Sequence, residues 1–109
     1  MNIDIRTTNV PLTDALSSFI TSRLSATLSR FNSGVRNIDV TVCDLNGPKG
    51  GNDMRCHVEV SLRNDDPVLI EERGDDLYAA IARAAQRAKN AVLRRVDAAK
   101  PHKMRFRAA

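Results

Sequence analysis

Hydrophobic residues recur at two different spacings along this chain, and the order of these spacings restricts the fold that it can adopt. Polar and apolar residues alternate, as in half-buried strands, at residues 2–8, 36–45, 54–63 and 68–73. Apolar residues three and four positions apart, as in amphipathic helices, occur at residues 13–31 and from about 76 to 96. Thr13 has the side chain of an N-cap for the first of these helices. The sequence therefore predicts the order strand, helix, three strands, helix.

This order also predicts the topology of the sheet. The first strand, the first helix and the second strand form a crossover unit, which places those two strands parallel. The later strands are joined by short turns, so their pairs are expected to be antiparallel. We therefore predict one α+β domain, β-α-β-β-β-α, in which a four-stranded mixed sheet carries two helices on one face. The domain is expected at residues 1–96, followed by a basic, disordered tail at residues 97–109.

The loop DLNGPKGGND, residues 44–53, contains three of the five glycines of the chain and raises the question of a phosphate site. A P-loop has its glycines between a strand and a helix, in the pattern GxxxxGK followed by Ser or Thr. That pattern is absent, and the next segment, MRCHVEVSLR, alternates like a strand. We predict a hairpin connection, from which Lys49 could at most touch a nucleic-acid backbone.

The two cysteines, Cys43 and Cys56, flank this loop. Because side chains alternate along a strand, Cys43 is expected to point away from the face that Cys56 shares with the core. Two cysteines on opposite faces cannot meet the geometry of a disulfide bond. Both are therefore predicted to be reduced thiols.

Residues that could support catalysis or bind a metal are few. His57 and Glu59 share a strand face and form the H-x-E of zinc deaminases, but the accompanying Pro-Cys-x-x-Cys is missing. A metal site formed by Cys43, Cys56 and His57 would need ligands from both faces of the sheet. We predict no metal, no cofactor and no enzyme activity.

Two further absences concern the location of the protein. No apolar run approaches the roughly 20 residues that span a membrane. The N-terminal segment MNIDIRTTNV has neither the basic start nor the apolar core of a secretion signal. A cytoplasmic location is the expectation.

Charge is distributed unevenly, although the net charge is only +4. Residues 83–109 contain nine Lys or Arg and one acid, whereas residues 1–82 contain eight bases and twelve acids. Such asymmetry indicates a polyanionic partner. The alternative is a solvated helix face followed by a soluble tail.

Basic residues on the second predicted helix are arranged in a stripe. Spacings of four, three and four place on one side Arg83, Arg87, Asn90 and Arg94. The apolar side is expected to consist of Tyr78, Ile81, Ala85, Ala88 and Val92. Because the stripe faces away from that side, substitutions in it are expected to cost little folding stability. We predict a phosphate-binding surface formed by Arg23, Arg30, Arg83, Arg87, Lys89, Arg94 and Arg95.

Three segments resemble the ribosome hibernation-promoting factor family, also called ribosome-associated inhibitors. They are the run Asp76-Leu77-Tyr78-Ala79-Ala80-Ile81, the helix start Thr13-Asp14-Ala15-Leu16 and the pair Arg23-Leu24. The resemblance covers residues 1–96 and implies a fold similar to a double-stranded-RNA-binding domain. It also implies basic contacts from Arg23, Arg87 and Arg94, which match basic positions of the family. Glu72 stands where a small apolar residue is usual.

The resemblance implies a single-domain protein that binds the small ribosomal subunit near the decoding region and silences translation under stress. Its partners would be rRNA and neighbouring ribosomal proteins, with no membrane and no small-molecule substrate, and it would be a monomer off the ribosome. Two alternatives stay open. One is a general binder of double-stranded RNA; the other is a protein-interaction module that regulates transcription, with a merely solvated basic stripe.

Overall fold

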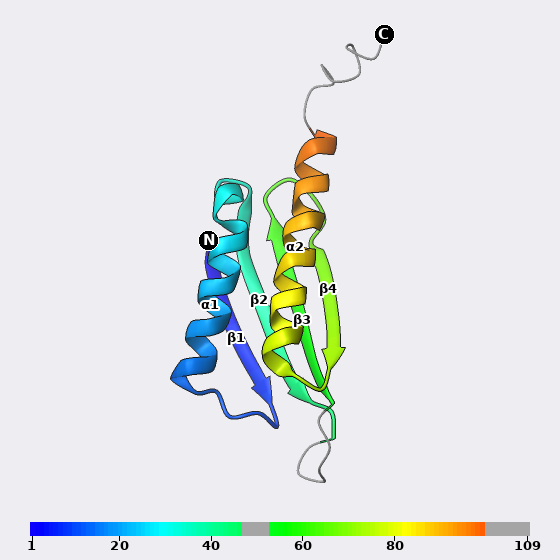
Figure 1. The fold of residues 1–109 in the computed structure, drawn as a ribbon. Helices are drawn as coiled ribbons and strands as arrows, with labels where there is room; N and C mark the ends of the chain where they lie inside the picture. Colours follow the sequence, from blue (N-terminus) through cyan, green and yellow to red (C-terminus); the bar gives the residue numbers. More distant parts are fainter. Residues whose placement is uncertain (47–52, 100–109) are drawn as a thin grey trace.

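The fold is a four-stranded sheet with two helices on one face, as the computed structural model of residues 1–46 and 53–99 shows (Figure 1). Along the chain the elements are β1 (Asn2–Thr8), α1 (Asp14–Leu28), a short 3-10 helix η1 (Ser29–Phe31), β2 (Val35–Asp44), β3 (Met54–Leu62), β4 (Val68–Gly74) and α2 (Leu77–Ala99). The α+β fold and its β-α-β-β-β-α order, predicted from the sequence, are confirmed.

The strands lie side by side in the order β1-β2-β3-β4. β1 pairs with β2 in parallel, and the other two pairs are antiparallel, as the crossover argument predicts. This register aligns one apolar row across the whole sheet, formed by Ile5, Val40, Val58 and Ile70. The helices cover the face on which this row lies.

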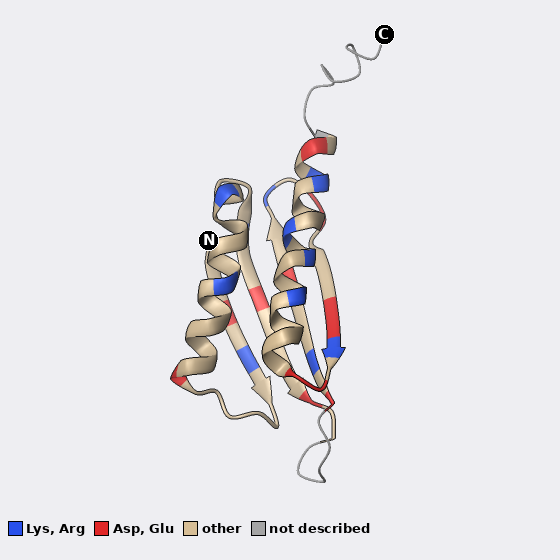
Figure 2. Ribbon diagram, in the orientation of Figure 1, with Lys and Arg blue, Asp and Glu red and all other residues tan. Residues whose placement is uncertain are grey.

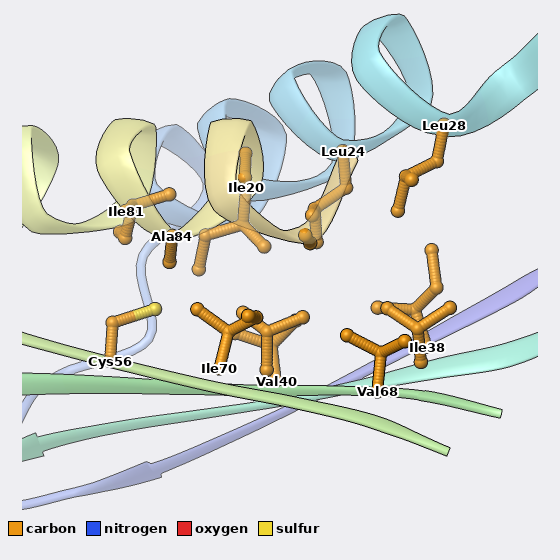
Figure 3. Packing of buried hydrophobic residues seen from close by; sticks show 14 of the residues in the cluster. Ile20, Leu24, Leu28, Ile38, Val40, Cys56, Val68, Ile70, Ile81 and Ala84 are labelled. Atoms are coloured by element: carbon orange, nitrogen blue, oxygen red, sulfur yellow. The ribbon is translucent and has the colours of Figure 1, made fainter. Parts of the chain in front are cut away.

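The core lies between that face and the two helices. Figure 3 shows Ile20, Leu24 and Leu28 of α1 pointing toward the strand side chains. From α2, five alanine or isoleucine side chains and one valine are buried: Ala80, Ile81, Ala84, Ala85, Ala88 and Val92. Each large aliphatic side chain buried here contributes about 1.5–3 kcal/mol of transfer free energy. The small alanines let α2 lie close to β3 and β4.

Both helices begin with a side-chain cap. The hydroxyl of Thr13 accepts a hydrogen bond from the backbone N–H of Leu16 at 3.1 Å, which confirms the predicted N-cap. At the start of α2, the carboxylate of Asp76 accepts from the N–H groups of Tyr78 and Ala79, at 3.0 and 3.3 Å. These oxygens satisfy donors that have no partner within a helix.

The structure differs from the predicted second helix in two respects. First, α2 continues to Ala99 rather than ending near Val96, so the first residues of the predicted tail are helical; the rest of that tail lies outside the described residues. Second, Tyr78 is 43% exposed and is not part of the buried side. Its ring meets that of Phe19 edge-on, with centroids 4.7 Å apart, because Tyr78 lies at the seam between the helices.

The glycine-rich segment connects two paired antiparallel strands. Asp44 at the end of β2 lies opposite Met54 at the start of β3, and the N–H of Leu45 donates to the carbonyl of Asp53 at 2.8 Å. The predicted hairpin connection is therefore confirmed. Lys49 and its neighbours, residues 47–52, lie outside the described residues.

Both cysteines are free thiols, as predicted. Cys56 lies opposite Val42 and Cys43 opposite Arg55, so the two side chains point to opposite faces of the sheet. Burial under the helices, together with the nearby charge of Glu72, raises the pKa of the Cys56 thiol to about 12. This thiol therefore stays protonated, and unreactive, at neutral pH.

Candidate nucleic-acid interface

Basic residues lie along both helices, whereas strand β4 and the turn before α2 carry acids (Figure 2). The predicted binding residues are Arg23 on α1, Arg30 on η1, and Arg83, Arg87, Lys89, Arg94 and Arg95 on α2. The structure divides them into side chains that pair with an acid and side chains that do not. This division decides which cations are available to a ligand.

Two arginines of the predicted stripe share one carboxylate. Arg83 Nε lies 3.0 Å from Glu72 Oε1, and Arg87 Nη1 lies 2.6 Å from Glu72 Oε2. These hydrogen bonds hold the pKa of Glu72 below its ordinary value. We call Glu72, Arg83 and Arg87 the Glu72 cluster. Because Arg83 and Arg87 are held by Glu72, we expect changes at these two positions to cost more folding stability than the position of the stripe alone predicts.

The same arginines also bind backbone carbonyls of β4, the strand at the edge of the sheet. Arg83 donates to the carbonyl of Arg73 at 3.0 Å, and Arg87 donates to that of Glu71 at 2.8 Å. An edge strand has carbonyl groups without a strand partner, and here arginines from the neighbouring helix supply donors. The Glu72 cluster thus joins α2 to the edge of the sheet.

Gly74, the last residue of β4, leaves room for this arrangement. A Cβ atom built on Gly74 would lie 2.9 Å from Arg83 Nη2, closer than real Cβ contacts. A side chain at this position would therefore displace the guanidinium of Arg83. The glycine and the arginine fit together across the β4–α2 connection.

Farther along α2, Arg95 also has partners. Its Nη1 donates to the carbonyl of Asp66 at 2.6 Å and lies 3.4 Å from Asp65 Oδ1. Its side chain is about one third exposed. Arg95 therefore ties α2 to the β3–β4 turn as well as contributing charge.

The other four predicted residues, Arg23, Arg30, Lys89 and Arg94, form no ion pair within the described ranges 1–46 and 53–99, and we call them the open basic surface. Arg23 lies over the ring of Phe19 and Arg30 over that of Phe31, each 5.1 Å from the ring centroid. Lys89 follows Tyr78 by about three helical turns, so it lies on the side of α2 that faces α1. These cations are available to a polyanion.

On the opposite face of the sheet, His57 lies beside Thr41 and Glu71 in the register. In the part of the chain that the structure describes, no group of three or more His, Cys, Asp or Glu side chains could hold a metal ion. Nor is any helix there long and apolar enough to cross a membrane.

Sequence reasoning identified the arginines but missed their partner. Glu72 is eleven and fifteen residues from Arg83 and Arg87, so no helical spacing connects them. The available signal was strand alternation, which places Glu72 on the same inward face of β4 as Val68 and Ile70. The acid was therefore positioned to face the helix that carries the arginines.

The fold and the open basic surface together define a small α+β domain suited to binding a polyanion. The chain belongs to the family described as sigma 54 modulation protein / S30EA ribosomal protein, whose model matches residues 3–100. This match confirms the resemblance found in the sequence. No curated protein matches the chain in a sequence comparison.

Two solved structures have a similar fold. The N-terminal domain of Thermus thermophilus Protein Y is 30% identical with a TM-score of 0.72, over 86% of this chain and 98% of that one. A ribosomal subunit interface protein from Coxiella burnetii is 14% identical with a TM-score of 0.74, over 89% of this chain and 99% of that one. At that identity the second match supports the fold alone.

Proposed function

We propose that this protein binds the small ribosomal subunit near the decoding region and inhibits translation there, which promotes ribosome hibernation under stress. The observation that carries the proposal is the open basic surface on the helical layer of a member of a ribosomal protein family. Its partners are rRNA and neighbouring ribosomal proteins in the cytoplasm. The protein acts as a monomer off the ribosome and performs no catalysis.

The chemistry of binding is that of cations on a structured RNA. Lys and Arg that neutralise phosphates release condensed counterions, which makes affinity strongly dependent on salt. Helical RNA is recognised mainly by its shape and its backbone, because side chains cannot read its deep major groove. A folded domain held in this way blocks the channel that mRNA and tRNA use. Translation is then inhibited simply because the bound protein occupies this channel.

The Glu72 cluster belongs to the same interface but contributes less. Two guanidinium groups against one carboxylate leave one net positive charge, and about half of each arginine side chain is exposed. Their geometry is already set by Glu72 and by β4 carbonyls. Phosphate contacts from Arg83 and Arg87 would therefore compete with existing bonds, whereas those from the open basic surface would not.

The test compares two double variants of equal charge. Arg23→Ala/Arg94→Ala removes cations from the open basic surface. Arg6→Ala/Arg55→Ala removes cations that form no ion pair within the described residues and that lie on the sheet face away from the helices. Co-sedimentation with purified small subunits should weaken markedly for the first variant and little for the second. Equal binding by both variants and the parent would contradict the proposed surface.

A second candidate is regulation of transcription, because the family description also contains the words sigma 54 modulation. Duplex RNA added as a competitor tests the other alternative, a general binder of double-stranded RNA. If a generic duplex displaces the protein from small subunits at equal nucleotide concentration, it is a general RNA binder. If the protein binds neither subunits nor RNA, the ribosomal proposal is wrong and a protein partner should be sought.

A further inference from the structure

The η1–β2 connection, the β3–β4 turn and the C-terminal half of α2 meet at one end of the molecule (Figure 1). Their side chains line a groove there. It consists of two hollows of about 170 and 200 Å³. The hollows adjoin, since both are lined by Ser33, Gly34, Leu62 and Val96. We call them together the end groove. None of the contacts of the Glu72 cluster involves it.

The floor of the end groove is apolar. Phe31 and Val92 are buried beneath it, and Leu62 and Val96 are half-buried along it. Each hollow is smaller than the roughly 300–1,000 Å³ of pockets for drug-sized molecules. The dimensions and the lining suit a single flat group rather than a large ligand.

The rim of the end groove contains three cations and one acid, Asp65, so its net charge is positive. Arg30 borders one hollow, and Arg63 and Arg95 border the other. Arg95 is occupied by Asp65 and Asp66, but Arg30 and Arg63 form no ion pair within the described residues. The hydroxyl of Ser33 and the amide of Asn64 add groups that can donate and accept hydrogen bonds.

We propose that the end groove receives one unpaired nucleotide of the RNA that the open basic surface binds, so this inference rests on the proposed function. The base would lie on the apolar floor, and Arg30 and Arg63 would bind its phosphate. Unstacked bases in single-stranded RNA stack on aromatic rings and on guanidinium planes, and arginine binds phosphate through two parallel hydrogen bonds. Arg30 already lies over Phe31, which places a guanidinium and a ring beside the floor.

Charge and shape together favour this occupant over simpler ones. An apolar peptide would leave Arg30 and Arg63 without a counter-charge at its border. A free phosphate would leave the apolar floor exposed to water. Bases within a continuous RNA duplex are stacked and paired, so they are not free to enter a hollow at the protein surface. A nucleotide from a loop, a bulge or a strand end has both a flat base to cover the apolar floor and a phosphate to bind the arginines of the rim.

The experiment uses a short single-stranded RNA that carries one fluorescent adenine analogue, and a blunt RNA duplex for comparison. Ser33→Phe introduces a large ring at an exposed position that borders both hollows. Asn32→Phe introduces the same ring one residue earlier, at an exposed position outside either lining, and is the matched control. Thermal unfolding establishes that each variant is folded.

We expect Ser33→Phe to weaken single-strand binding by about tenfold or more, the effect of losing one stacked base, and to abolish the fluorescence change. Duplex binding should stay within about twofold of the parent, and Asn32→Phe should behave like the parent with both RNAs. Arg63→Ala changes an exposed side chain that forms no ion pair within the described residues, so it tests the rim even if Ser33→Phe does not fold. It should weaken single-strand binding and reduce its salt dependence.

Three outcomes would overturn the inference: unchanged single-strand binding by Ser33→Phe and Arg63→Ala, equal losses with duplex and single strand, or displacement of the RNA analogue from the groove by inorganic phosphate alone. Co-sedimentation of the parent with small subunits separates this inference from the proposed function. If the parent binds subunits and the groove variants lose nothing with either RNA, only the end groove is misassigned. If the parent fails to bind subunits at all, the proposed function itself is wrong.

Discussion

Two groups of arginines on the same helical layer differ in what surrounds them. In the Glu72 cluster, Arg83 and Arg87 share one carboxylate and each also binds a carbonyl of β4. In the open basic surface, Arg23 lies over an aromatic ring, and neither Arg23 nor Arg94 forms an ion pair within the described residues. The same residue type thus joins structural elements in one region and is left available for a ligand in the other.

For Arg23 and Lys89, the difference from the Glu72 cluster follows from the neighbouring element that each residue faces. The Glu72 cluster faces the edge strand, where an acid and backbone carbonyls are within reach of a guanidinium. Arg23 borders the seam between the two helices, where it lies over the ring of Phe19, which meets that of Tyr78. Lys89 lies on the same side of α2 as Tyr78. Before a binding role is assigned to the cations of a basic helical stripe, each cation should therefore be classified by the groups that neighbour it.

The largest expected effect comes from reversing charge on the open basic surface. Arg23→Glu/Arg94→Glu should abolish binding to small subunits at moderate salt, because lost phosphate contacts are replaced by repulsion. The free energy of unfolding should fall by about 1 kcal/mol or less, since Arg23 loses a ring contact but no ion pair within the described residues. Sedimentation and urea unfolding measure the two effects. Subunit binding at the parent level would contradict the assignment.

Reversal of the Glu72 cluster should mainly affect stability. Arg83→Glu/Arg87→Glu places three carboxylates beside β4 and removes two hydrogen bonds to its carbonyls. We expect a loss of about 1–3 kcal/mol in the free energy of unfolding, moderated by the partial exposure of both arginines. Urea unfolding measures it. A stability equal to that of the open-surface variant would remove the distinction between the two groups.

Acid should weaken the Glu72 cluster selectively. Hydrogen bonds from Arg83 and Arg87 lower the pKa of Glu72 in the folded state, relative to 4.5 for an ordinary glutamate. Its stabilisation is therefore present above that ordinary value and is lost as pH falls through the lower folded-state pKa. Glu72→Gln should be less stable than the parent at neutral pH, and the gap should narrow in acid.

The control for this titration is Glu71→Gln. Glu71 is the neighbouring acid, but it points to the other face of β4 and forms no ion pair within the described residues. Its stability curve should run parallel to that of the parent between neutral and acid pH. A Glu72→Gln curve that also runs parallel to the parent would show that the ion pairs contribute nothing to stability.

The smallest expected effect is that of Gly74→Ala. The new Cβ would displace Arg83 Nη2, the far end of a flexible side chain, and leave Arg87 in place. Losing the Arg83 contact lowers the free energy of unfolding, whereas replacing glycine by alanine raises it by restricting the unfolded chain. The two effects oppose each other, so the net change should be about 1 kcal/mol or less. In the Arg83→Ala background, Gly74→Ala should lower the free energy of unfolding by less than it does in the parent protein. Strict additivity in this double-mutant cycle would argue against the contact.

Much of the fold was predictable because strand alternation and helical spacing are local properties. The pattern at 36–45 and 54–63 predicted β2 and β3 to within one residue. The end of α2 was missed because Asp97, Ala98 and Ala99 continue a helix that nothing yet interrupts; alanine is the best helix former. Tyr78 was misplaced because helical spacing alone does not say where the neighbouring helix ends and solvent begins.

The candidate site was predictable only in part. Spacing showed that Arg83, Arg87 and Arg94 share one side of α2, and this side depends only on local geometry. Their partners depend on which strand lies beside α2, which is a tertiary property. Arg63 gave no signal at all, because a single arginine in a turn between strands has no periodicity; only the packing of η1, β3 and α2 brings it to the end groove.

We propose that the open basic surface, rather than the Glu72 cluster, carries ribosome binding. The salt dependence of affinity tests this claim most directly. The dissociation constant for small subunits would be measured across a range of salt for Arg23→Ala/Arg94→Ala and for Arg83→Ala/Arg87→Ala, each shown to be folded. Each lost phosphate contact lowers the slope of log affinity against log salt by roughly 0.7–0.9. For the first variant we expect the slope to fall by the amount that corresponds to about two lost phosphate contacts. For the second variant we expect a fall that corresponds to less than one contact. An equal or larger decrease for the second would contradict the account.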